Sequence, residues 1–383
     1  MKNLLFIVES IPDELFIKKN GLNFYKKKGV NVNILYIAGL CRPDYYKNIK
    51  NKTKMKFFDG KNKNLITFYL KEKISKDTIV FCLYRKNNKT IFINKILKSE
   101  NIKTAFISME SSLQYNNSFI QKLKILFFNP KIFFKLFIIK LNYHKNVNLN
   151  YSYVFTAGKL SEDNYKKNSN SKVYQIHHYD FDFFSNIKKK IKEKNYVLFL
   201  SPASKNPDTY DKNPGLFNKN YLTWNNKNYN SNIRNFLIKI SKYTNKKIII
   251  AEHPKEHTKI GKTLGFKSFR GVSSELIKNC SFVVCFDTTA FQIAVLLKKP
   301  IIFLTSKNLP EKIIKDIKNR CFFFEKYPIK IENNLDYKDI KFNLNINKKN
   351  YEKYIKLYIT NTRKELRKYK SYELIYKYLE NKI

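Results

Sequence analysis

The sequence has little of what marks several common classes of protein. Its five cysteines show no CxxC spacing, which excludes a cysteine zinc finger and indicates a reducing cytoplasm. No run reaches about 18 uninterrupted apolar residues, so we expect no segment to span a membrane. The apolar run at the N-terminus is too short for a signal peptide and has no small-residue cleavage site, so it predicts a first buried strand.

Several enzyme motifs are also missing. The sequence has no P-loop, GxGxxG, HExxH or GxSxG motif, so kinases, dehydrogenases, zinc proteases and α/β-hydrolases have no specific support. An acidic pair, Asp180 and Asp182, lies beside the predicted domain linker and not at a strand end. We therefore expect neither a metal nor a resident cofactor.

Positive charge is abundant, but it comes mostly from lysine. The formal net charge is +45, yet only seven of the 75 basic residues are arginine, the better reader of bases and phosphates. The lysines are spread over both halves of the chain. A basic nucleic-acid-binding protein without catalysis, or a scaffold at a membrane surface, therefore stays an alternative, and the charge favours anionic partners in general.

Short apolar runs of strand length alternate with segments long enough for crossover helices, and this alternation predicts parallel α/β sheets. The expected strands of the first half are residues 4–8, 32–37, 78–83, 104–108, 153–156 and 173–176. Those of the second half are residues 196–200, 247–251, 282–286 and 300–304, with 322–324 as a candidate closing strand.

A charged stretch at 188–194 separates the two sets of strands. The fold class predicted is α/β, with two Rossmann-like doubly wound domains facing a cleft, at residues 1–190 and 195–330. Residues 348–379 contain no proline or glycine. Residues 345–383 are therefore expected to form closing helices.

Polar residues follow the predicted strands of the second domain. Ser201 and Ser204 come after the first strand, and Glu252, His253 and Pro254 come at the end of the next. Proline cannot continue a strand ladder and forces a turn, so the imidazole is presented at the carboxyl edge of the sheet, where it can donate to a phosphate or ribose oxygen. A loop histidine without a ligand is the alternative.

Two further groups of hydroxyls stand where helices are expected to begin. Asp287, Thr288 and Thr289 lie between a strand and a helix at 289–297, so a threonine near the helix start is a candidate phosphate ligand. Ser273 and Ser274 resemble a second capped helix start that contacts base or ribose. Ordinary helix capping is the alternative for both groups.

One acid of the first domain also follows a predicted strand. Glu110 lies just past the strand at 104–108, where its carboxylate can accept the proton of a hydroxyl or, alternatively, only favour a helix start. Glu9 and Asp59 are secondary candidates. Residues 120–141 interleave lysines with large apolar residues, which predicts either contact with an anionic membrane surface or a pair of core helices broken at Pro130.

The strand-end blocks at 196–204, 248–254, 276–290 and 299–304 resemble the donor half of a GT-B glycosyltransferase of bacterial capsule or lipopolysaccharide synthesis. A His-Pro pair followed by two hydroxyls is similar to bacterial sialyltransferases and related enzymes that use CMP-linked nonulosonic or ulosonic acids. The resemblance implies that His253, Thr288 and Thr289 bind the nucleotide phosphate. The acidic pair before glycine in those enzymes is reduced here to Asp59-Gly60, so Glu110 is the substitute base.

This resemblance implies a metal-independent transfer of sugar from a nucleotide-activated donor, CMP-linked, to a glycan or lipid-linked acceptor. Transferases of UDP- or GDP-hexose and polymerases that use CDP-glycerol stay open as alternatives. The expected location is the cytoplasm, with peripheral attachment to the inner face of its membrane.

Overall fold

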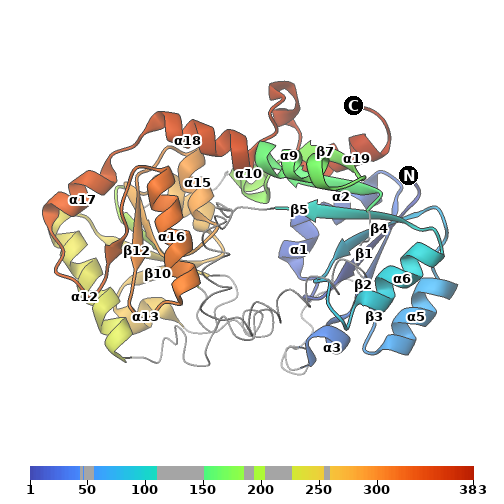
Figure 1. Ribbon diagram of the computed structural model, residues 1–383. Coiled ribbons are helices and arrows are strands. Elements are labelled where there is room, and N and C mark those ends of the chain that lie inside the picture. Colours follow the sequence, from blue (N-terminus) through green and yellow to red (C-terminus); the bar gives the residue numbers. More distant parts are fainter. Residues whose placement is uncertain (44–45, 47–55, 110–150, 185–193, 203–226, 254–258) are drawn as a thin grey trace, which may run out of the picture. The chain divides into compact units, whose positions relative to one another are not determined.

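A computed structural model describes residues 1–43, 46, 56–109, 151–184, 194–202, 227–253 and 259–383 (Figure 1). These residues form two compact units. Unit 1 holds the described residues up to 176 together with 361–383, and unit 2 holds those from 177 to 360. Within the described part, no helix is both long and apolar enough to cross a membrane.

Unit 1 is built on a parallel sheet of seven strands in the order β3-β2-β1-β4-β5-β6-β7. Its strands are β1 (Asn3–Val8), β2 (Asn31–Tyr36), β3 (Phe58–Asp59), β4 (Thr78–Leu83), β5 (Lys103–Ser108), β6 (Tyr153–Ala157) and β7 (Lys172–Ile176). Most of their side chains are buried on both faces, as expected of a parallel sheet covered by helices. The order reverses at β1, so the unit is doubly wound, with its switch point between β1 and β4.

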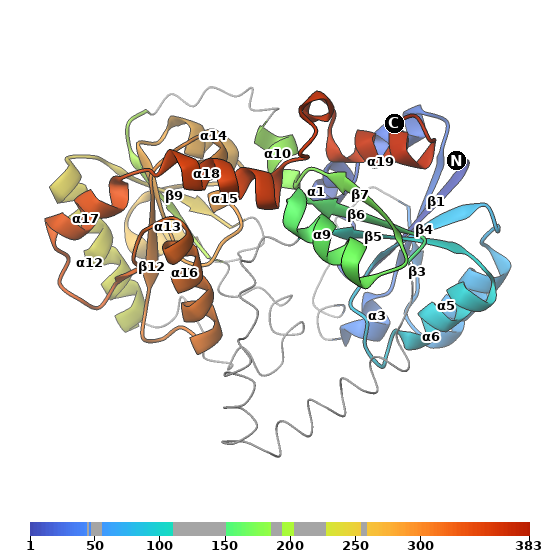
Figure 2. The same cartoon turned by 45° about the horizontal axis from the view of Figure 1, so that its top comes forward.

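The helices of unit 1 follow the apolar spacing of the sequence. They are α1 (Glu14–Lys19), α2 (Leu22–Lys27), α3 (Ala38–Cys41), α5 (Lys63–Glu72), α6 (Ile91–Ser99), α9 (Gly158–Asn168), a 3₁₀ helix (Lys364–Lys368) and α19 (Ser371–Leu379). In α6, Ile93 and Leu97 lie one turn apart and are both fully buried. Helices α9 and α19 pack against β7, as Figure 2 shows.

Unit 2 is built on a second parallel sheet, of six strands in the order β10-β9-β8-β11-β12-β13. The strands are β8 (Val197–Leu200), β9 (Ile248–Glu252), β10 (Lys267–Arg270), β11 (Phe282–Cys285), β12 (Ile301–Thr305) and β13 (Ile329–Lys330). Its helices are α10 (Tyr179–Phe184), α12 (Lys227–Thr244), α13 (Ile260–Leu264), α14 (Ser273–Asn279), α15 (Phe291–Leu296), α16 (Glu311–Phe323), α17 (Tyr337–Leu344), α18 (Lys348–Tyr354) and a π-helix (Ile355–Ile359). The order reverses at β8, so this unit is doubly wound as well.

The sheets confirm the prediction of two doubly wound α/β units. Apart from the candidate strand at 322–324, every predicted strand is present, and each of its ends lies within one residue of the expected position. The candidate strand at 322–324 is wrong, because this apolar run ends α16, where Ile317, Cys321 and Phe324 recur at helical spacing and are buried. The short edge strands β3, β10 and β13 were not predicted, since two to four residues carry too little periodicity.

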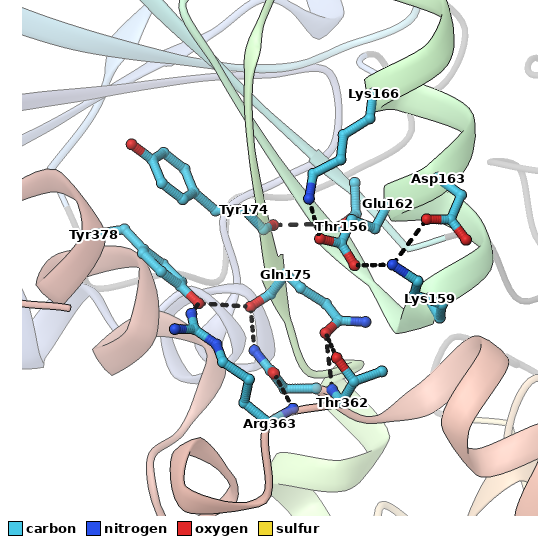
Figure 3. Close-up of polar contacts among 11 residues, drawn as sticks. Thr156, Lys159, Glu162, Asp163, Lys166, Tyr174, Gln175, Thr362, Arg363 and Tyr378 are labelled. Atoms are coloured by element: carbon cyan, nitrogen blue, oxygen red, sulfur yellow. Dashed lines mark hydrogen bonds and ion pairs between the residues drawn. The ribbon is translucent and has the colours of Figure 1, made fainter.

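Hydrogen bonds at the two places where the chain passes between the units explain which residues join each unit. Gln175 of β7 accepts hydrogen bonds through its backbone carbonyl from the Asn361 amide and the Tyr378 hydroxyl, and through Oε1 from the Thr362 N–H at 2.8 Å (Figure 3). The segment 361–383 therefore belongs to unit 1, while 345–360 belongs to unit 2. In unit 2, the His178 N–H donates to the carbonyl of Ile359 at 2.7 Å, so residues 177–184 group with unit 2.

Candidate functional site

The candidate site lies at the carboxyl edge of the unit 2 sheet, around its central strand. Strand β8 runs between β9 and β11, and its last residue, Leu200, is in register with both Ala251 and Cys285. The residues that follow therefore emerge at the same edge of the sheet, Ser201 level with Glu252 and Phe286, and His253 and Asp287 one residue further along. In open parallel sheets, ligands bind at this edge and at the point where the strand order reverses.

Two of the predicted ligand residues follow β8 and β9 at this edge. Ser201 is buried, its N–H donates to Ala251 O at 3.0 Å, and its hydroxyl donates to the Pro202 carbonyl at 3.4 Å. His253 directly follows β9 and is half-buried. The structure thus brings Ser201 and His253 to adjacent strand ends. Ser204 and Pro254 lie outside the described residues.

Glu252, the last residue of β9, has its carboxylate held by the protein itself. Oε1 accepts hydrogen bonds from the Gly261 N–H and the Ser268 hydroxyl, both at 3.0 Å, and Oε2 pairs with the Arg270 guanidinium at 2.8 Å. Burial alone would raise the pKa of Glu252, but these donors outweigh it and hold the pKa below its ordinary value. Glu252 therefore anchors β10 and α13 beside His253, and contact with a ligand stays a prediction.

Gly261 is required by this close packing. A Cβ at that position would come within 2.2 Å of the Ser268 hydroxyl oxygen. The absence of a side chain allows the backbone N–H to reach the Glu252 carboxylate.

The two serines predicted to cap a helix lie inside its first turn. Helix α14 begins at Ser273, and the residue before it is Val272. Within the described residues, no side chain caps this helix start, so the expected start is confirmed and the expected capping by Ser273 or Ser274 is wrong. A contact of either serine with a ligand stays a prediction.

The third strand end carries Asp287, Thr288 and Thr289. The Thr288 hydroxyl accepts a hydrogen bond from the Ala290 N–H at 3.3 Å, so a threonine stands near a helix start as expected. The helix α15 begins only at Phe291 and has six residues, fewer than predicted. The phosphate-binding role expected of these residues stays a prediction.

Asp287 is paired with an arginine that the sequence reasoning did not single out. Arg320 of α16 lies 2.5 Å from Asp287 through Nη1 and Oδ1, and its guanidinium stacks 5.0 Å from the Phe291 ring centre. Burial alone would lower the pKa of Arg320, but the Asp287 carboxylate outweighs it and raises the pKa, so the guanidinium stays charged. The sequence signal that could have singled out Arg320 is that it is the one arginine in a helix whose other basic residues are all lysine.

Unit 1 places a different acid at its own switch point. Val8 at the end of β1 is in register with Tyr36 and Leu83, and Glu9 follows directly. The Glu9 carboxylate is mostly buried and accepts a hydrogen bond from the Arg85 N–H at 3.1 Å. Glu9 is thus a candidate acid that the structure brings to the switch point of unit 1.

The remaining candidates of the first domain fall in different places. Glu110 and the segment 120–141 lie outside the described residues, so their roles stay predictions. The Asp59 carboxylate, at the edge strand β3, accepts a hydrogen bond from the Tyr46 hydroxyl at 2.6 Å. Among the residues that the structure describes, no group of three His, Cys, Asp or Glu side chains is placed to hold a metal ion.

Comparison with known proteins identifies the fold. No family model matches the sequence, and no curated protein matches it. The S. aureus MnaA structure with UDP superposes with a TM-score of 0.51 at 13% identity, covering 100% of this chain and 98% of that one. A UDP-GlcNAc 2-epimerase from Methanocaldococcus jannaschii gives 0.48 at 14% identity over 99% of each chain, and MurG from Acinetobacter baumannii gives 0.49 at 6% identity over 100% of each.

At such identities the likeness shows the fold alone. The MnaA match, together with two doubly wound parallel sheets in one chain, defines a GT-B-like fold and confirms the predicted fold class.

We expect Glu252→Gln to destabilise the protein by about 1–3 kcal/mol at pH 7, because it removes the ion pair with Arg270 and weakens two buried hydrogen bonds. A carboxyl whose folded pKa is lowered stabilises the fold above its unfolded pKa of about 4.3, and this contribution is lost as the pH falls through the folded pKa. In urea unfolding, the difference between wild type and variant should therefore shrink as the pH falls below the unfolded pKa of about 4.3.

Glu352→Gln is the matched control. Its pair with Lys298 is exposed, so we expect its effect to stay below about 1 kcal/mol at every pH. A loss for Glu252→Gln that is the same at neutral and acid pH would contradict the assigned network.

Proposed function

We propose that the protein is a glycosyltransferase that binds a nucleotide-activated sugar at the carboxyl edge of unit 2. The observation that carries this proposal is the register of β8 with β9 and β11, which sets Ser201, His253 and Asp287 to Thr289 at one switch point. The S. aureus MnaA structure of the same fold was solved with UDP, which supports a nucleotide ligand.

The proposed chemistry is displacement of a nucleotide from the sugar. The bond between the anomeric carbon and the phosphate oxygen breaks, and that oxygen keeps the electron pair. His253 and the hydroxyls of Thr288 and Thr289 stabilise the negative charge that develops there. The acceptor oxygen forms the new bond, and its proton passes to a carboxylate of unit 1.

The donor nucleotide is proposed to be a pyrimidine. The His-Pro pair and the following hydroxyls resemble enzymes that use CMP-linked sugars, whereas the structural relative was solved with UDP. A cytidine or uridine nucleotide satisfies both. The acceptor proposed is a glycan or a lipid-linked glycan of surface polysaccharide synthesis, at the inner face of the cytoplasmic membrane.

Epimerisation of a nucleotide sugar is a second candidate. A structure described as a UDP-N-acetylglucosamine 2-epimerase matches with a TM-score of 0.50 at 13% identity, over 100% of this chain and 95% of that one. Proton NMR of UDP-N-acetylglucosamine incubated with the protein, with no acceptor present, separates the two. A C2 epimer indicates epimerisation, and an unchanged sugar favours transfer.

A nucleotide panel tests the proposed site most simply. In titration calorimetry with CMP, UDP, GDP and ADP, we expect a pyrimidine nucleotide to bind most tightly. His253→Ala should weaken that binding about tenfold or more, because a hydrogen bond to phosphate is lost. Lys247→Ala removes a basic side chain just before the opposite end of β9 and should leave the affinity unchanged. Preference for a purine, or equal effects of both variants, would count against the proposal.

The acid of unit 1 is tested by separating binding from transfer. We expect Glu110→Gln to keep the nucleotide affinity of the wild type and to lower the transfer rate by about 10²-fold or more, because the proton acceptor is removed. Glu9→Gln is the comparison. Full activity of Glu110→Gln with loss in Glu9→Gln would assign the role to Glu9, and full activity of both would remove the carboxylate from the proposed mechanism.

A further inference from the structure

Arg320 and Asp287 form a pair of which only the acid is accessible. The Arg320 side chain is 6% exposed and the Asp287 side chain 34%. A buried guanidinium without a counter-charge is strongly unfavourable, so Arg320 fixes the position of the carboxylate. Solvent and ligands reach this pair through Asp287.

Arg320 also holds the loop in which the predicted phosphate ligands lie. Its guanidinium contacts Asp287 at the beginning of the loop and stacks on Phe291 at the end, so it bridges the residues on either side of Thr288 and Thr289. Within the loop, the Thr288 hydroxyl accepts the Ala290 N–H. These contacts define the conformation of the loop before any ligand binds.

The Asp287 carboxylate itself is unfavourable for a phosphate. A carboxylate offers a phosphate only like charge and acceptor oxygens, whereas a neutral hydroxyl meets a strong hydrogen-bond acceptor there. Asp316 lies one helical turn before Arg320 on α16, and its pKa is raised by burial and then by the negative charge of Asp287, while Arg320, Lys312 and Lys315 lower it.

We propose that Asp287, held by Arg320, recognises hydroxyl groups of the ligand and does not bind its phosphate. This inference rests on the proposed nucleotide-sugar function and divides the predicted Asp287, Thr288 and Thr289 group into two roles. The threonines, with His253, face the phosphate, and Asp287 accepts hydrogen bonds from the ribose or from the activated sugar. Arg320 acts as a positioning residue.

Titration calorimetry on the full chain tests this division. The ligands are UMP, 2′,3′-dideoxy-UMP, UDP and UDP-N-acetylglucosamine, with the cytidine analogues CMP and 2′,3′-dideoxy-CMP. We expect Asp287→Asn to weaken the binding of hydroxyl-bearing ligands about tenfold, because a charged acceptor becomes a neutral one. Loss for UMP or CMP but not for the dideoxy forms assigns the ribose. Loss for UDP-N-acetylglucosamine but not for UDP assigns the sugar.

Two further variants control for structure. Asp316→Asn borders the same guanidinium but lies on α16, and it should not lower any affinity. The double variant Asp287→Asn with Arg320→Gln removes both charges, so no buried charge is left unpaired, and it should reproduce the ligand selectivity of Asp287→Asn if the protein remains folded by circular dichroism.

Several results would overturn the proposal. One is that Asp287→Asn leaves the binding of every ligand unchanged, and another is that it weakens the binding of all of them equally, dideoxy forms and UDP included. Either result with a wild type that binds the ligands overturns the role of Asp287 alone. A wild type that binds none of them overturns the proposed function and this inference with it.

Discussion

The parallel pairing of β8 with its two neighbours is the constraint on which the candidate site depends. Leu200 is in register with Ala251 on one side and Cys285 on the other, so Ser201, His253 and Asp287 emerge at one edge of the sheet. A slip of one residue in either pairing would turn the following side chains to the opposite face of the sheet. The buried side chains of these strands hold the register, because exposing them to water would cost far more than any single polar contact contributes.

Arginines have a special place in this lysine-rich chain. Arg320 is paired with Asp287, Arg270 with Glu252, and Arg42 donates to the backbone carbonyl of Glu9. Each contact lies where a strand ends near a switch point. A planar guanidinium keeps its charge when buried and directs several donors in fixed directions, which a lysine ammonium does not. The abundant lysines supply most of the positive charge, whereas these three arginines hold a carboxylate or a carbonyl group in place at a strand end.

The strands and the double winding were readable from the sequence because buried parallel strands are continuous apolar runs bounded by polar residues. The same signal failed at 322–324, where an apolar run belongs to the buried side of a helix. Local spacing also could not predict that Arg320 pairs with Asp287. The two residues lie 33 positions apart, and the packing of α16 against β12 brings them together. The start of α14 was placed correctly, but capping by Ser273 or Ser274 depends on backbone angles that composition does not determine.

Hydrogen exchange of the full chain, with and without a saturating pyrimidine nucleotide, tests the central claim most directly. We expect the ligand to slow exchange at Ser201, 252–253 and 286–290, where the three strands end, and to leave the amino ends of the same strands unchanged. Protection at the amino ends, or no protection at any of the three strand ends while the nucleotide is bound, would contradict a ligand site at this edge of unit 2.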